Sequence, residues 1–209
     1  MLDQSRPSSG AILIVDDDPD ILRVFQKILV SHGYGNTLLA NSGTDAVSLL
    51  NTYQEEISVV LLDLKMPGMD GIAVMRHLVN VHQLPIAIIV QTGHSEVLSR
   101  EEFFALGTET VLATEYMTKP FDTSVLLKEV EKAFVYVERK RKALHREAEA
   151  RLVAKLEKIE SMLTTVQKNQ HGWLAELGLE LMKALVIALA LLALLYLGVD
   201  DFVRKVLPK

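Results

Sequence analysis

The sequence predicts an α/β fold, a doubly wound five-stranded parallel sheet followed by a long helix and a carboxyl-terminal hydrophobic helix. Short aliphatic runs alternate with stretches whose apolar residues recur at helical spacing, a pattern typical of parallel sheets covered by helices. Acidic residues stand directly after two of the aliphatic runs, where open α/β sheets keep their sites. With 209 residues, 49% of them hydrophobic, the chain is long enough for one such domain and an appendage.

The expected elements follow one another along the chain. Residues 1–9 are polar and without periodicity, which predicts a disordered arm. A buried strand over 12–15 leads into an acidic run, in which Asp18 and Pro19 predict the cap and first residue of a helix that ends at His32 and Gly33. Three more strand and helix pairs are expected at 37–40 and 43–51, 59–62 and 71–81, and 86–90 and 96–106.

A fifth strand is expected near residues 114–117, with the last helix of the domain starting at Asp122. The apolar run of residues 11–15 is too short for the core of a signal peptide, so we expect the amino-terminal part in the cytosol. The domain is predicted to cover residues 10–135.

Composition excludes several classes of function. The sequence has no cysteine, which excludes disulfides, thiol chemistry and cysteine-based zinc sites. Residues 10–135 hold 8 Lys and Arg against 17 Asp and Glu, whereas residues 136–209 hold 13 against 9. The acidic part would repel a phosphate backbone and the basic part is interleaved with Glu, so no nucleic-acid partner is expected.

Five polar side chains are expected to meet at one edge of the sheet, because parallel strands all end on the same side. They are Asp16, Asp17, Asp63, Thr92 and Lys119. Carboxylates and a backbone carbonyl are ligands that Mg²⁺ prefers, and a carboxylate beside the metal could attack a phosphoryl group while Lys and Thr neutralise its oxygens. Singly, Asp63 could cap its turn, Thr92 could be a turn residue and Lys119 a solvated charge.

Four motifs carry a resemblance to a known family. They are Ile-Leu-Ile-Val-Asp-Asp-Asp-Pro, Leu-Leu-Asp-Leu-Lys-Met-Pro-Gly-Met-Asp-Gly, Gln-Thr-Gly-His and Tyr-Met-Thr-Lys-Pro-Phe. Through them the first 135 residues resemble the receiver domain of two-component response regulators, a flavodoxin-like fold exemplified by the chemotaxis receivers.

The resemblance implies a role for each matching residue. The phospho-acceptor falls on Asp63, the metal ligands on Asp16, Asp17, Asp63 and the backbone carbonyl of Lys65, the switch residues on Thr92 and Tyr116, and the phosphate-binding lysine on Lys119. It also implies Mg²⁺ as cofactor, and a histidine kinase or phosphotransfer protein as the phosphoryl donor. The protein would not be an enzyme beyond its own phosphorylation and dephosphorylation.

Two departures from the family pattern stand out. The segment from Thr92 to Lys119 is a few residues longer than usual, with the extra length around residues 107–113. This predicts that the face that usually reads out phosphorylation, including the switch position Tyr116, is remodelled. Lys65 places a flexible cation two residues past the acceptor, and we expect it to alter the lifetime of an aspartyl phosphate.

The residues after the domain predict one long helix, because Pro is absent between positions 121 and 207 and the first Gly after 107 is Gly172. Over residues 136–178 this helix is expected to form a coiled coil, and a homo-oligomer is the natural partner. Its apolar seam follows alternating spacings of four and three: Leu152, Leu156, Ile159, Leu163, Val166, Gln170, Trp173 and Leu177. Alternatively, this stripe folds back onto the receiver. The basic cluster of residues 139–142 is interpreted as a solvated helix face, or as attracted to the acidic domain of a neighbour.

Residues 179–199 are predicted to be a transmembrane helix, followed by a short tail over 200–209. The stretch from 181 to 199 would extend about 28 Å, close to the roughly 30 Å of a hydrocarbon core. A buried oligomer core or a helix in the membrane plane are the alternatives. Flanking basic residues do not set the orientation. The orientation follows instead from the phosphoryl donor, which is cytosolic. We therefore expect a single-pass protein at the cytoplasmic face of the bacterial inner membrane, with its amino terminus in the cytoplasm.

These expectations combine into one functional hypothesis. The chain would be a membrane-tethered response regulator that accepts a phosphoryl group on Asp63 and signals by protein contact, without a DNA-binding output. Asp16 and Asp18 also spell the Asp-x-Asp of haloacid-dehalogenase-type phosphohydrolases, whose first Asp is the nucleophile, so such an enzyme is one alternative. A non-phosphorylated membrane scaffold is the other.

Overall fold

The structure is a computed structural model of the chain, and it describes residues 10–81, 84–93, 98–108, 111–169, 178, 180–185 and 187–188. The chain divides into two compact units, Met1–Leu144 and His145–Lys209. The arm predicted over 1–9 and the tail predicted over 200–209 lie outside the described residues.

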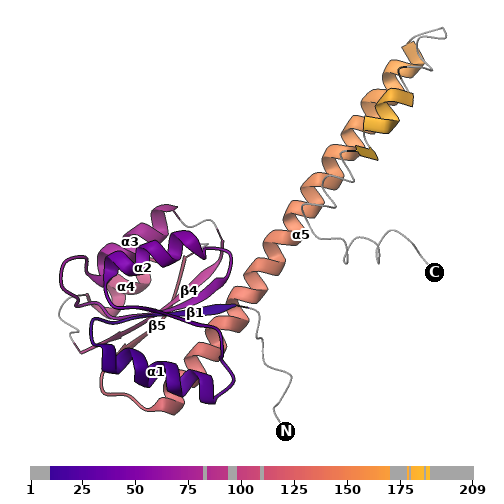
Figure 1. The fold of residues 1–209 in the computed structure, drawn as a ribbon. Helices are drawn as coiled ribbons and strands as arrows, with labels where there is room; N and C mark the ends of the chain where they lie inside the picture. Colours follow the sequence, from indigo (N-terminus) through magenta and orange to yellow (C-terminus); the bar gives the residue numbers. More distant parts are fainter. Residues whose placement is uncertain are drawn as a thin grey trace. The chain divides into compact units, whose positions relative to one another are not determined.

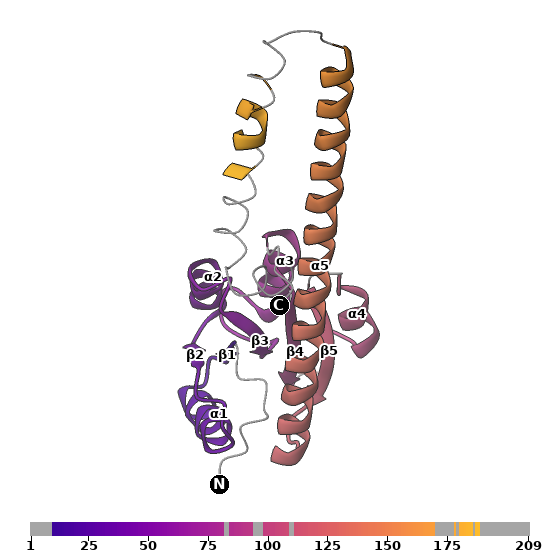
Figure 2. The same ribbon diagram turned by 90° about the vertical axis from the view of Figure 1, so that its right-hand side faces the viewer.

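The first unit is built on a parallel five-stranded sheet (Figure 1), as predicted. Its strands are β1 (Ala11–Val15), β2 (Thr37–Ala40), β3 (Ile57–Leu62), β4 (Ile86–Thr92) and β5 (Val111–Thr118). They lie in the order β2-β1-β3-β4-β5 (Figure 2), and every neighbouring pair is parallel. The strand order therefore reverses between β1 and β3, which is the point at which doubly wound sheets hold their ligands.

Helices cover both faces of this sheet, so the strands β1, β3 and β4 are buried along their whole lengths. The helices are α1 (Pro19–Ser31), α2 (Gly43–Thr52), α3 (Gly71–Val81), α4 (Arg100–Ala105) and α5 (Thr123–Asn169). In Figure 1, α2, α3 and α4 lie on one face and α1 on the other. Alternate residues of each strand enter separate cores: Leu13 and Val60 pack toward α2 and α3, whereas Ile12 and Val59 pack toward α1 and α5.

Local signals set the helix ends. Asp18 caps α1 by accepting from the Asp20 N–H at 2.8 Å, and Pro19 is the first helical residue, as predicted. The prediction of a helix over 96–106 was wrong at its start. Ser99 and Glu102 form a capping box, so α4 begins at Arg100.

β5 is longer than predicted and contains a bulge. Its register with β4 shifts between Ile88, which pairs with Ala113, and Ile89, which pairs with Glu115. The Thr114 hydroxyl donates to the Ile88 carbonyl at 2.9 Å. Thr114 is thus an extra residue of β5 in its pairing with β4.

α5 is a continuous helix of 47 residues, in agreement with the long helix predicted from the sequence. Its first part packs on the sheet through Leu126, Val130, Ala133 and Phe134. Arg141 is half-buried and donates from Nη2 to the Ile57 carbonyl at 3.0 Å, at the start of β3. The interpretation of the whole basic cluster as a solvated face was therefore wrong for Arg141.

In the second unit, the side chains described at seam positions are half-buried, namely Leu152, Leu156, Ile159 and Leu163. The residues between them are exposed, so the seam is a distinct face of α5. Val166, Gln170, Trp173 and Leu177 fall where no side chain is described. Among the residues that the structure describes, no helix is both long enough and apolar enough to cross a membrane. Most of the predicted transmembrane span lies outside those residues.

Candidate functional site at the carboxyl edge of the sheet

Two acidic side chains stand at the point where the strand order reverses. Asp16 follows β1 directly and Asp63 follows β3, and the Asp63 N–H donates to the Val15 carbonyl at 2.9 Å. Gly71 starts α3 against this strand end. A Cβ there would lie 2.2 Å from the Asp63 carbonyl oxygen, so a larger residue would displace the backbone that carries Asp63.

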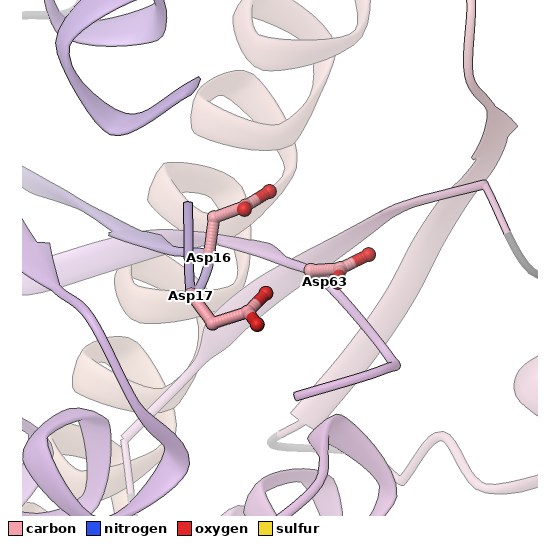
Figure 3. Close-up of side chains that lie close together, drawn as sticks. All are labelled: Asp16, Asp17 and Asp63. Carbon is pink, nitrogen blue, oxygen red and sulfur yellow. The ribbon is translucent and has the colours of Figure 1, made fainter. Parts of the chain in front are cut away.

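Asp17 completes a group of three carboxylates. Oxygen atoms of Asp16, Asp17 and Asp63 lie within 4.8 Å of one another. Figure 3 shows the three side chains side by side. Asp16 and Asp63 are buried, whereas Asp17 is exposed. Hard carboxylate oxygens with an open side for water suit Mg²⁺, which binds a few carboxylates and retains several waters, so the residues present fit this ion.

Lys119 is the cation of the site. Its ammonium lies 2.7 Å from Asp16 Oδ2 and 3.7 Å from Asp63 Oδ1. Its backbone N–H donates to the Thr92 carbonyl at 2.8 Å, and the peptide bond to Pro120 is cis. Lys119 therefore contacts the first acid and faces the second, and β4 fixes its backbone.

The electrostatic environment of Asp63 is a balance of opposing effects. Burial raises the pKa of its carboxyl most strongly, and the negative charge of Asp16 raises it further. Lys119, the Leu64 N–H and the Thr92 hydroxyl lower the pKa, and the net result is a pKa above the ordinary value. Ionised Asp63 is thus a carboxylate for which an added cation would be favourable.

The acids and Lys119 line one open depression of about 530 Å³. Its other lining residues are Asp18, Ile21, Lys65, Met66, Pro67 and Gly93. Lys65 is exposed at this depression, beside the acids, as its position in the sequence predicts. The depression is open, so small solutes can reach the acids from solvent.

Tyr116 lies apart from the acids. It is buried, its hydroxyl donates to the Leu98 carbonyl at 2.8 Å, and its ring centroid is 5.8 Å from that of Phe103. Arg100 of α4 donates to the Tyr116 carbonyl at 3.3 Å. Tyr116 therefore ties β5 to α4 and to the segment before it, and it pairs with Val90 of β4, two residues before Thr92.

One polar residue of the site was not singled out from the sequence. Gln91 is fully buried in β4, and its Nε2 donates to Asp16 Oδ2 at 3.3 Å. The available signal was a polar residue that extends an otherwise aliphatic strand. It was not used because the strand was expected to end at Val90.

Comparisons with known proteins agree with this geometry. Residues 12–131 match the family described as the response regulator receiver domain. A response regulator receiver domain protein from Clostridium thermocellum is 27% identical, with 65% of this chain and 98% of that chain covered and a TM-score of 0.52. The structure of a CheX–CheY–BeF3–Mg²⁺ complex from Borrelia burgdorferi is similar at 24% identity, with coverage of 62% and 98% and a TM-score of 0.53. The latter similarity is one of fold.

Proposed function

Because this chain belongs to the response regulator receiver domain family, we propose that it accepts a phosphoryl group on Asp63 from a phosphohistidine of a histidine kinase or phosphotransfer protein. The observation that carries this proposal is the group of Asp16, Asp17 and Asp63, whose oxygens lie within 4.8 Å at the edge of the sheet. Lys119 beside them supplies the positive charge that phosphoryl chemistry needs.

The reaction is a displacement at phosphorus. An Asp63 carboxylate oxygen attacks the phosphorus atom, and the P–O bond forms while the P–N bond to the donor imidazole breaks. The electron pair of that bond stays on the departing imidazole nitrogen. Lys119, 3.7 Å from Asp63 Oδ1, balances the charge of the transferring oxygens, and the Thr92 hydroxyl donates to one of them.

Mg²⁺ would be held by Asp16, Asp17, Asp63 and the Lys65 backbone carbonyl, and its charge would stabilise the phosphoryl oxygens. The raised pKa of Asp63 supports this proposal, because the ionised carboxylate is poorly compensated by the protein alone. Asp17 is exposed, which leaves its oxygens accessible to the hydrated ion.

The output of the protein would be protein contact. The sequence after residue 135 contains no DNA-binding motif and no second set of catalytic residues. We propose that phosphorylation changes the binding of a partner, or the self-association of the chain through α5, at the cytoplasmic face of a membrane reached by residues 179–199. The apolar composition of that stretch supports the tether.

The test is labelling of the purified full-length chain with acetyl phosphate and Mg²⁺, followed by intact mass spectrometry. The wild-type chain gains one phosphoryl group, which is lost on treatment with hydroxylamine, as expected of an acyl phosphate. Asp63→Asn gains none. Asp70→Asn is the matched control, because Asp70 lies in the same loop, caps the Ala73 N–H at 2.8 Å and tolerates Asn in that role.

Other outcomes would favour the alternatives. If the Asp63→Asn variant still takes up phosphate and the Asp16→Asn variant does not, a phosphohydrolase with Asp16 as nucleophile would be favoured. A folded wild-type chain that takes up no phosphoryl group from acetyl phosphate or phosphoramidate would favour a scaffold.

A further inference from the structure

The side chain of Gln91 is polar in a place that favours apolar residues. It is 0% exposed, and all of β4 around it is buried. Its Nε2 reaches Asp16, but its Oε1 is buried without a hydrogen-bond partner among the described residues. Because an unsatisfied buried carbonyl destabilises a folded protein, an aliphatic side chain would be the more stabilising choice for the strand alone.

Asp16 accepts hydrogen bonds from three different segments. Lys119 Nζ lies 2.7 Å and Gln91 Nε2 3.3 Å from Oδ2, and the Asp18 N–H lies 3.0 Å from Oδ1. The two donors on Oδ2 differ in freedom. The Lys119 side chain is 23% exposed and has a long flexible stem, whereas Gln91 is enclosed in the sheet.

Lys119 also lies close to the proposed phospho-acceptor, Asp63. Its ammonium is 3.7 Å from Asp63 Oδ1, and a phosphoryl group on that oxygen would attract it more strongly than the carboxylate does. Any movement of Nζ toward the phosphoryl group takes it away from Asp16 Oδ2. Gln91 is then the side-chain donor that remains on that oxygen among the described residues.

We propose that Gln91 is a positioning residue for Asp16, which keeps the carboxylate in its metal-binding orientation when Lys119 turns to the phosphoryl group. The proposal rests on the function proposed above. The hydrogen bond from Gln91 also connects Asp16 to β4. The next residue of that strand, Thr92, donates from its hydroxyl to Asp63, and its carbonyl accepts from the Lys119 N–H.

The test uses Gln91→Met, which keeps the length and approximate volume of the side chain and removes the amide. Mg²⁺ affinity of the full-length chain is measured by titration calorimetry in the wild-type and in a Lys119→Met background. In the second background Gln91 is the remaining side-chain donor, so Gln91→Met should weaken Mg²⁺ binding about tenfold, the low end of what a hydrogen bond to a charged group contributes. With Lys119 present the loss should be smaller.

Thermal unfolding without metal separates positioning from a purely structural role. Gln91→Met removes the unsatisfied Oε1 together with the hydrogen bond to Asp16, and these two changes oppose each other, so its Tm should stay close to that of the wild type although Mg²⁺ binds more weakly. Gln26→Met is the matched control. Gln26 donates to the Thr37 hydroxyl at 3.1 Å between α1 and β2, and its loss should leave Mg²⁺ affinity unchanged.

A lowered Tm with unchanged Mg²⁺ affinity in both backgrounds would overturn the proposal. If Gln91→Met does not fold, Gln91→Asn gives the same comparison, because it keeps an amide but withdraws it by one methylene. The proposed function is judged separately, on the wild-type chain. If the wild-type chain binds Mg²⁺ and is labelled on Asp63, the proposed function stands even when Gln91→Met has no effect on Mg²⁺ affinity. A wild-type chain that neither binds Mg²⁺ nor is labelled would overturn both the proposed function and the role of Gln91.

Discussion

Asp63 is held in a site that disfavours its own charge. Burial and the neighbouring Asp16 carboxylate raise its pKa, and Lys119, the Leu64 N–H and the Thr92 hydroxyl only partly offset them. A metal ion would stabilise a carboxylate with these neighbours, and under the proposed function the phosphoryl oxygens would attract the same cations after transfer. The arrangement of charges around Asp63 therefore lowers the stability of the metal-free protein, as is common at functional sites.

We therefore expect Asp63→Asn to stabilise the metal-free protein. The folded pKa of Asp63 lies above its unfolded value of 3.8, so between the two values the folded state binds more protons than the unfolded state. The contribution of Asp63 to stability therefore falls as pH rises through that window. Removal of the charge should raise the free energy of unfolding at pH 7 by about 0.5–2 kcal/mol.

Urea unfolding in EDTA measures this gain. It should shrink as pH falls and disappear below the unfolded pKa, where the Asp63 carboxyl is protonated in both states. Asp45→Asn, outside the site, should show no comparable gain at pH 7. A lower stability for Asp63→Asn at pH 7 would contradict the expected balance.

Lys65 adds a second cation at the mouth of the depression. If Asp63 is phosphorylated as proposed, the exposed Lys65 ammonium would attract the phosphoryl oxygens, and exposed ion pairs of this kind contribute up to about 1 kcal/mol. Lys65→Ala should therefore shorten the lifetime of the aspartyl phosphate about two- to fivefold. Loss of the label after removal of acetyl phosphate gives the rate, with the exposed Lys27→Ala on α1 as a charge-matched control. Equal rates in the wild type and Lys65→Ala would remove this role.

At the scale of elements, the first part of α5 is anchored to the strand that ends in Asp63. Arg141 donates to the Ile57 carbonyl at 3.0 Å, at the opposite end of β3 from the acid. Burial lowers the pKa of this guanidinium, and its Nε has no hydrogen-bond partner among the described residues. The contact therefore combines a favourable charged hydrogen bond with a cost of desolvation.

We expect the hydrogen bond to outweigh the cost of desolvation, because Arg141 is only half-buried. Arg141→Ala should lower the free energy of unfolding of the first unit by about 1–2 kcal/mol. Arg139→Ala, an exposed arginine on the same helix, should change it by less than about 0.5 kcal/mol. Chemical denaturation followed by circular dichroism compares the two. Equal effects would indicate that helix propensity alone, rather than the contact with β3, is responsible.

The elements that could be predicted from the sequence are those specified locally. Asp18 and Pro19 fix the start of α1, and aliphatic runs identify the strands. The bulge at Thr114 depends on register with β4, which no local pattern reveals. The start of α4 at Arg100 is specified locally by the capping box of Ser99 and Glu102, a signal that the sequence interpretation missed. The contacts of Gln91 and Arg141 join residues far apart in sequence, so no local pattern predicts them.

The same distinction applies to the candidate site. Asp16, Asp17 and Asp63 could be predicted because the topology rule brings strand ends together, and the structure places their oxygens within 4.8 Å. That Lys119 contacts Asp16 more closely than Asp63 could not be predicted. This detail depends on side-chain geometry rather than on the order of the strands.

At the scale of the whole molecule, α5 is one uninterrupted helix whose residues belong to both compact units. Its first part packs on the sheet, and beyond Leu144 its half-buried positions recur at spacings of four and three, a coiled-coil pattern. The helix that carries the seam is thus also the helix that contacts β3 within the first unit. Self-association of the chain is therefore the property that best tests the role of α5.

The double variant Leu156→Glu and Leu163→Glu should convert an oligomeric chain into a monomer. Two charges on the seam would have to be buried in the interface, which costs several kcal/mol for unpaired ions. Sedimentation equilibrium of the full-length chain in detergent measures the mass. Ala154→Glu with Thr164→Glu is the matched control, because both positions are exposed on the same helix and add the same charge. A wild-type chain that is already monomeric would instead indicate that the half-buried seam is covered within a single chain, and α5 would then serve as a spacer rather than an assembly helix.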